Sequence, residues 1–283
     1  MLGDRVRGGP ARLPGPLARS ALSHAAVPAR RRALKTLAWV GIGGGALAVA
    51  QSQWPWRERL ADSLADLRTG TGERSERVLA DGTRLLLNTA TSVDIDFDAT
   101  RRLIVLHGGE IMVVTAHDPA GRPLQVRTRE GLLTPIGTRF TVRRDATSSS
   151  APGFTRLAVQ VGAVEIRVAS VTPVLVRAGE QSHFTDGVVE APSALDEAAQ
   201  SWVDGTLMAE RMRLADLLAE LGRYRSGRLR CDPAVADLRV TGIWPLDGSD
   251  PSERVLASLE RTLPVTVSRL TRYWVTVGPR ASR

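Results

Sequence analysis

The stretch that decides the fold class is Leu103-Ile104-Val105-Leu106-His107-Gly108-Gly109-Glu110-Ile111-Met112-Val113-Val114. It holds two short apolar runs on either side of a Gly-Gly step. Short runs of this kind, bounded by turn residues, are typical of β-strands. We therefore expect strands at residues 103–107 and 111–114. We expect a turn at Gly108-Gly109, because glycine supplies the positive φ that tight hairpins need.

The same pattern extends from Val78 to about Glu190, with further turn signals at Asp81-Gly82 and Ala178-Gly179. No helical period separates the runs. They predict an all-β domain, sandwich or solenoid-like, over residues 76–191. The expected strands are 83–87, 93–97, 103–107, 111–114, 124–127, 138–143, 157–161, 164–168 and 174–176.

The composition changes after Pro192, where helical periods appear. A first amphipathic helix is indicated by apolar residues close to i, i+3, i+4, i+7 spacing, namely Leu207, Leu214, Leu217, Leu218, Leu221 and Tyr224. A second opens at Asp250-Pro251-Ser252-Glu253, with an acidic N-cap, proline at N1 and glutamate at N3. Two strands are expected after each helix, at 229–231, 238–243, 265–270 and 273–277. Residues 192–283 are therefore expected to form a small α/β domain.

The basic residues are concentrated at the start of the chain. Residues 1–35 carry a net +7 of the chain's formal +8. Residues 1–34 are rich in proline and arginine without apolar periodicity, which predicts a disordered basic tail. The near-neutral remainder does not favour nucleic-acid binding.

An uncharged run of 21 residues follows, from Thr36 to Trp56. Residues 35–56 are expected to form a single transmembrane helix, although glycines make the span weakly hydrophobic and a buried soluble helix is the alternative. The cluster Arg30 to Lys35 favours a cytoplasmic N-terminus. Arg31-Arg32 also fits a twin-arginine export signal. Export by the general route or by the twin-arginine route would place the residues after the span in the periplasm. Residues 57–75 are expected to form a partly helical linker.

Candidate reactive groups are few. The single Cys231 excludes an intramolecular disulfide, and the four histidines show no metal-ligand spacing. Asp94, Asp96 and Asp98 alternate with apolar residues, so a solvated outer strand face is favoured over a cation site. We expect no catalytic residue, no metal site and no cofactor.

Four motifs follow one another along the β region, namely Leu79-Ala80-Asp81-Gly82-Thr83, Gly108-Gly109-Glu110, Arg122-Pro123 and Gly137-Thr138-Arg139-Phe140. In this order they resemble the FecR family of periplasmic sigma-factor regulators. The spacing Trp202-x-x-Gly205-x-Leu207 makes the C-terminal part similar to a secretin/TonB short N-terminal-like domain. The motif residues are Asp81, Gly82, Gly109, Glu110, Arg122, Pro123, Gly137, Thr138 and Phe140, then Trp202, Gly205 and Leu207.

The resemblance implies an inner-membrane anti-sigma factor without enzymatic activity. Its periplasmic body would read a TonB-dependent outer-membrane transducer in iron or siderophore signalling, and its cytoplasmic part would hold an extracytoplasmic-function sigma factor until proteolysis releases it. Family members carry a longer helical region before the span. A misplaced start at Met1, a truncated chain, or sigma binding by another protein would each explain the difference. The alternative function is an exported module that binds a cell-envelope polymer.

The α/β domain is expected to dock the transducer. The candidate partner-binding residues lie on two strands whose edges we expect to be open to strand addition. They are Val265, Val267, Leu270, Tyr273, Val275 and Val277. The alternative is that these two strands pair with each other as a hairpin.

Overall fold

The computed structural model describes residues 65–145, 153–169, 171–248 and 250–280. These residues belong to one compact unit. The predicted tail (1–34) and span (35–56) lie outside the described residues. Within the described part of the chain, no helix is long and apolar enough to cross a membrane.

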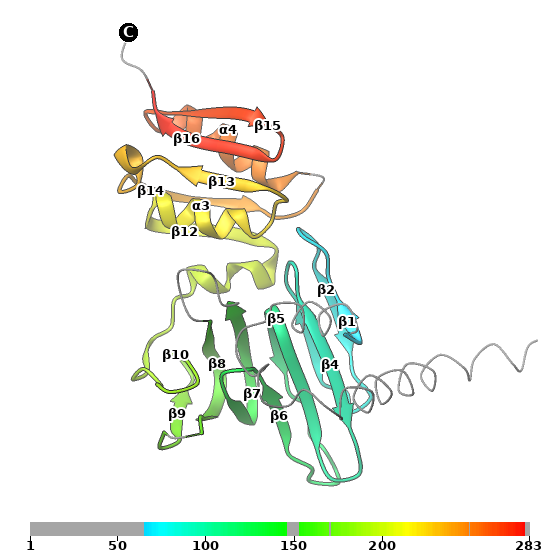
Figure 1. The fold of residues 1–283 in the computed structure, drawn as a ribbon. Coiled ribbons are helices and arrows are strands. Elements are labelled where there is room, and N and C mark those ends of the chain that lie inside the picture. The colour runs from blue at the N-terminus through cyan, green and yellow to red at the C-terminus, as the bar shows by residue number, and fades with distance from the viewer. Residues whose placement is uncertain (1–64, 146–152, 170, 249, 281–283) are drawn as a thin grey trace, which may run out of the picture. The chain divides into compact units, whose positions relative to one another are not determined.

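The first part of the described chain is an all-β domain, which confirms that part of the fold prediction (Figure 1). Its strands form one 11-stranded sheet. They are β1 (Leu67–Arg68), β2 (Ser75–Val78), β3 (Arg84–Leu87), β4 (Ser92–Phe97), β5 (Arg102–Val114), β6 (Leu124–Arg127), β7 (Leu132–Asp145), β8 (Phe154–Arg167), β9 (Val174–Arg177), β10 (Glu180–Phe184) and β11 (Ser193–Ala194).

The expected turn at Gly108-Gly109 is wrong, because both apolar runs belong to the single strand β5. The first half of β5 pairs with β4 and β6, and the second half pairs with β3 and β7. Gly109 has φ +88° and lets the strand change neighbours without ending. The expected break between 161 and 164 is wrong for the same reason, since β8 continues through Gly162 at φ +80°.

The Ala178-Gly179 step is also a bulge and not a hairpin turn. β9 and β10 lie end to end along β8, each antiparallel to it. Gly179 has φ +82°, and its N–H donates to the carbonyl of Val159. By contrast, Asp81-Gly82 does connect two paired strands, β2 and β3, as expected.

One hydrophobic cluster fills the β-domain and draws on strands β3 to β10. Phe140 and Phe184 are its largest fully buried side chains. Because alternate residues of a strand face opposite sides, Asp96 and Asp98 lie exposed while Val93 is buried. Asp96 pairs with Arg101. The predicted solvated face is confirmed for Asp96 and Asp98, whereas Asp94 is half-buried and lies 3.0 Å from His107 Nε2.

The second part is an α/β domain with a two-stranded and a three-stranded sheet. Its elements are η1 (Ala198–Asp204), β12 (Thr206–Arg213), α3 (Leu214–Gly222), β13 (Arg228–Cys231), η2 (Pro233–Val235), β14 (Arg239–Pro245), α4 (Pro251–Thr262), β15 (Val265–Thr271) and β16 (Trp274–Pro279). Both helices and the four expected strands are present. Two residues predicted for the first helix are exceptions: Leu207 lies in β12, and Tyr224 lies in the turn after α3.

The helices begin and pack as the sequence indicates. Asp250 caps α4 by accepting a hydrogen bond of 3.1 Å from the N–H of Glu253. Val255, Leu256 and Leu259 are fully buried on one face of α4. The apolar residues of α3 and α4 enter one cluster with β15 and β16, and Cys231 packs half-buried against it.

The short terminal strands of the β-domain extend past the predicted limits of 76–191. β1 pairs with β4, so Leu67 is in a strand and not in a helical linker. β11 pairs with β10.

Candidate functional site

The predicted partner-binding strands form a hairpin with each other. β15 pairs antiparallel with β16, and β16 also pairs in parallel with β13. β16 is therefore the central strand of its sheet, and the prediction that residues 273–277 form an open edge is wrong. Val265, Val267, Val275 and Val277 are buried core residues, whereas Leu270 and Tyr273 are exposed.

β15 is an edge strand, but side chains occupy the outward-facing backbone groups of Val265 and Val267. The N–H of Val267 donates to Glu260 Oε1 at 2.7 Å. The carbonyl of Val267 accepts from Arg269, and that of Val265 from Arg280, both at 3.2 Å. A strand added at this edge would have to displace these side chains, so the edge is protected.

A polar cluster joins the two domains; we call it the junction cluster, and it consists of Asn88, Glu110, Arg143, Glu220, Arg223 and Tyr224. Arg223 Nη2 donates to Glu110 Oε2 at 2.8 Å, and Arg223 Nη1 donates to Glu220 Oε1 at 2.5 Å. Arg143 Nη1 donates to Glu220 Oε2 at 2.7 Å. Two arginines of the cluster thus alternate with two glutamates across the junction.

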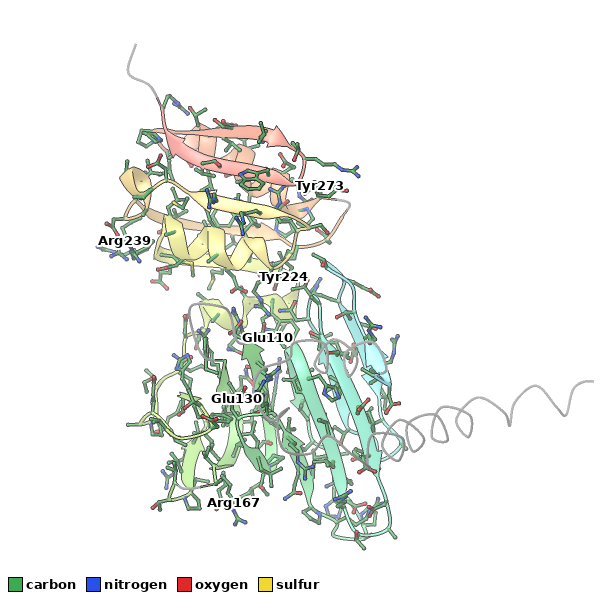
Figure 2. The ribbon with its side chains drawn as sticks, viewed as in Figure 1. Glu110, Glu130, Arg167, Tyr224, Arg239 and Tyr273 are labelled. Atoms are coloured by element: carbon green, nitrogen blue, oxygen red, sulfur yellow. The ribbon has the colours of Figure 1, made fainter. Side chains whose placement is uncertain are left out.

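The neutral members of the junction cluster complete it. The amide nitrogen of Asn88 donates to Glu110 Oε2 and to the hydroxyl of Tyr224, both at 2.9 Å. Figure 2 labels Glu110 and Tyr224 among the side chains of the two domains. Asn88 and Tyr224 are buried, so water cannot replace either partner of their hydrogen bond. Loss of one partner would therefore destabilise the folded protein.

The charges of the junction cluster stabilise one another. Burial would lower the pKa of Arg223, but Glu110 and Glu220 outweigh this effect and raise it. Burial would raise the pKa of Glu220, but Arg223 and Arg143 outweigh it and lower it. Burial raises the pKa of Tyr224 well above its ordinary value, so this residue stays a neutral phenol. Arg223 and Glu220 therefore remain charged and paired near neutral pH.

Glycine conformations bring Glu110 to the junction. A Cβ atom on Gly109 would lie 2.4 Å from Thr91 Oγ1 and 2.8 Å from the carbonyl of Ala90. The bend of β5 at this point therefore requires glycine. The residue that follows the bend is Glu110, whose N–H bonds to Thr91 at 3.0 Å.

The motif residues around η1 make a second contact across the junction. Arg74 of the β-domain donates to the carbonyl of Trp202 at 2.8 Å. A Cβ atom on Gly205 would lie only 2.6 Å from Nη2 of Arg74, so the guanidinium of Arg74 packs where a larger residue would clash. Trp202 and Leu207 are buried in the α/β core. These three motif residues therefore position the start of the α/β domain against the β-domain.

The remaining charged motif residues form a network inside the β-domain. Asp81 accepts from Arg102 at 2.6 Å and from the hydroxyl of Thr83 at 2.7 Å. Arg102 reaches the carbonyl of Arg122, and Arg122 pairs with Asp118 at 2.9 Å. The N–H of Arg102 donates to the carbonyl of Pro123. Burial opposes the charge of Asp81, but its hydrogen bonds prevail and lower the pKa of Asp81.

Two further motif residues mark the bulge of β7. Gly137 has φ +60°. The N–H of Thr138 donates to Thr115 Oγ1 at 2.8 Å. Since β7 resumes its pairing with β8 after this point, the bulge places Phe140 in the core.

Comparison with known families identifies the region that contains these motifs. Residues 65–165 match the FecR protein family. The FecR match begins before β1 and ends inside β8, so it includes Asp81, Glu110, Arg122 and Phe140. The α/β domain lies outside the FecR match.

Two solved structures have a similar fold over a longer stretch. Both are crystal structures of a "putative anti-sigma factor" from Parabacteroides distasonis ATCC 8503, with TM-scores of 0.60 and 0.59 and 21% sequence identity. The similarity covers 76% and 75% of this chain, and 98% and 97% of those chains. At this identity the likeness shows the fold alone. No curated protein matches the chain.

The sequence indicated parts of the junction cluster without assembling it. Glu110 stands among the motif residues, and Arg223 directly precedes Tyr224, the last residue of the apolar series that predicts the first helix. Their contact joins residues 113 positions apart and leaves no periodic signal. Arg143 and Glu220 carried no sequence signal that we used.

Proposed function

We propose that this chain is a membrane-anchored regulator of an extracytoplasmic-function sigma factor. The observation that carries the proposal is the FecR match over residues 65–165, within a fold shared with two structures described as an anti-sigma factor. In this proposal residues 35–56 anchor the chain in the inner membrane, residues 1–34 face the cytoplasm, and the body lies in the periplasm. The chain acts by binding and has no catalytic step.

The junction cluster supports a relay between the two domains. A partner that binds the α/β domain acts on Arg223 and Glu220, and these residues contact Glu110 and Arg143 of the FecR-matched sheet. A change at one domain therefore has a direct path of charged contacts to the other. The α/β domain, as a secretin/TonB short N-terminal-like domain, would receive the signal of a TonB-dependent outer-membrane transducer.

The alternative envelope-binding function receives less support from the β-domain. Aromatic side chains on exposed strand faces are expected in a polymer-binding module. Phe140 and Phe184 are fully buried, and Phe97 packs against the core. Phe154 is half-buried beside His183. None of the described phenylalanines offers an exposed stacking surface.

The test is transcription in a strain that lacks the chain. We expect one set of genes under a single extracytoplasmic-function sigma factor to change, with a TonB-dependent transducer gene among them or beside the gene of this chain. Re-expression of the chain should restore the original transcript levels. Unchanged transcription of every such set, under inducing and non-inducing conditions, would contradict the proposal.

A further inference from the structure

The outer face of the three-stranded sheet and the adjoining β15–β16 turn carry a group of exposed arginine, aromatic and leucine side chains. We call it the arginine–tryptophan face; its members are Arg228, Arg230, Leu270, Arg272, Tyr273 and Trp274. Leu270, Tyr273 and Trp274 are 81%, 48% and 41% exposed. In Figure 2, Tyr273 is labelled on this domain.

Strand alternation puts Arg228, Arg230 and Trp274 on one side of the sheet, whereas Arg272 and Tyr273 belong to the adjoining turn between β15 and β16. Arg228 lies beside Trp274 in the parallel pairing of β13 and β16, and Arg230 lies beside Thr276. The intervening residues Val275 and Val277 point into the core. Along these strands, the exposed residues of the face alternate with the valines that fill the core.

The arginines are held against aromatic rings. The guanidinium carbons of Arg228 and Arg230 lie 5.4 and 5.7 Å from the Trp274 ring centroid. That of Arg272 lies 4.6 Å from the ring centroid of Tyr273. Stacking restricts these long side chains while their N–H groups remain available to acceptors.

The face is positively charged and lacks internal compensation. Other arginines of the domain, including Arg213, Arg254 and Arg269, have carboxylate partners. Among the described residues, no carboxylate forms an ion pair with Arg228, Arg230 or Arg272. Charge complementarity therefore calls for an acidic occupant.

The composition of the face favours a protein over a phosphate polymer. Tryptophan, tyrosine and arginine are the residues that contribute most at protein interfaces. Leu270 adds apolar area that a charged polymer does not use. The near-neutral body of the chain also lacks the extended positive surface that polyanion binding requires.

We propose that the arginine–tryptophan face is the docking surface for an acidic segment of a partner protein. The segment lies across the face and not along β15, because side chains already occupy the outward-facing backbone groups of Val265 and Val267. Its carboxylates meet the three arginines, and its apolar side chains cover Trp274 and Leu270. This inference goes beyond the proposed function, since it names a surface and a chemistry and does not require sigma-factor regulation.

The test measures binding of a defined peptide pair to the full chain in detergent. One peptide alternates Glu and Asp with Leu and Tyr, and its twin replaces each acid by Gln or Asn. We expect the acidic peptide to bind at least about tenfold more tightly than the twin, and to weaken as salt is raised. Arg228→Gln with Arg230→Gln, and separately Trp274→Ala, should each weaken acidic-peptide binding about tenfold or more.

A matched control removes the same charge elsewhere in the domain. Arg239→Gln with Arg261→Gln alters two exposed arginines on β14 and α4. We expect this control to bind the acidic peptide as the unaltered chain does. Equal binding of the two peptides, no binding of the acidic peptide, or an equal loss in the control would overturn the proposal. Binding of inorganic polyphosphate or phosphatidylglycerol vesicles in place of the peptide, lost on Arg228→Gln with Arg230→Gln, would assign the face to anionic polymers or lipids and also overturn it.

Discussion

Arg223 Nη2 lies 2.8 Å from Glu110 Oε2, and 113 residues of sequence separate the two. One belongs to the α/β domain and the other to the FecR-matched sheet. Their side chains are 16% and 5% exposed, so the pair is largely removed from water. A buried ion pair is sensitive to the loss of either partner, because the remaining charge has no water to compensate it. The two domains are therefore coupled through this contact.

Arg223→Met is expected to destabilise the protein by about 3 kcal/mol, because it leaves Glu110 buried without its cation. Asn88 still donates to Glu110, which limits the loss. Urea unfolding followed by circular dichroism measures the change. The matched control is Arg84→Met, which breaks the exposed pair of Arg84 with Glu76 and should cost about 1 kcal/mol or less.

The same variant tests whether the domains unfold together. Within the body of the chain, the tryptophans are Trp202, Trp244 and Trp274, all in the α/β domain. In a fragment that begins at Ala65, and so lacks Trp39, Trp54 and Trp56, fluorescence therefore reports that domain, while the circular dichroism of strands reports chiefly the β-domain. We expect coincident transitions in the unaltered protein and separated ones in Arg223→Met. Coincident transitions in both would show that the junction cluster does not couple the domains.

Stability should fall as the pH is lowered through the acid range. The folded protein lowers the pKa of Glu220 through Arg223 and Arg143, against the effect of burial. It lowers the pKa of Asp81 through Thr83 and Arg102, again against burial. Carboxylates with a lowered folded pKa stabilise the protein above their unfolded pKa of about 4, and this contribution is lost as the pH falls through the folded pKa.

Urea midpoints measured between neutral pH and pH about 3 check this dependence. We expect the midpoint to decline most steeply below pH about 4. Glu220→Gln should make the decline less steep, because one of the responsible groups no longer titrates. A midpoint that rises on acidification would contradict the assignment.

The sequence predicted the helices better than the strand boundaries, and the reasons are physical. Leu217, Leu218 and Leu221 repeat at the helical period, which does not depend on distant residues. A glycine with positive φ serves a turn or a bulge equally well, so Gly109 and Gly179 could not be assigned before their partner strands were known. The start of β7 was missed because Pro135 normally interrupts a strand.

The candidate site was harder to predict than the fold. Val265, Val267, Val275 and Val277 have the composition of any strand, and whether such a strand is an edge depends on which other strands join it. The protection of the β15 edge by Glu260 comes from a side chain on α4. The sequence therefore identified the hairpin residues but not which of their groups remain exposed.

Leu218→Ala should cost about 2–5 kcal/mol, because Leu218 is buried in the α/β core and the substitution leaves a cavity. Leu270→Ala is the matched control, since Leu270 is exposed and its loss should change stability by about 0.5 kcal/mol or less. Urea unfolding followed by tryptophan fluorescence compares the two. Similar costs for both variants would mean that the core is not placed as described.

Membrane topology tests the part of the proposal that lies outside the described residues. A reporter active only in the periplasm, fused after Arg283, should be active in cells. Replacing Arg31 and Arg32 by lysine should abolish export if the twin-arginine route is used, and should leave it unchanged if the general route is used. Activity confined to a cytoplasmic reporter at the same junction would contradict the proposed orientation.

Gly109→Ala and Gly179→Ala separate two costs that glycine avoids. Both residues have positive φ, +88° and +82°, so alanine is strained at either position by about 1–2 kcal/mol. At Gly179 nothing lies within 4 Å of the added Cβ. At Gly109 the Cβ would lie 2.5 Å from the Cα of Thr91, which forces the backbone of β5 away from the strand connection at Thr91. Gly109→Ala should therefore destabilise the protein more than Gly179→Ala does, in urea unfolding.

Because Glu110 follows Gly109, the Gly109→Ala substitution should also separate the unfolding transitions of the two domains, as Arg223→Met does. Equal costs at the two positions would show that the close approach at Gly109 does not hold Glu110 at the junction.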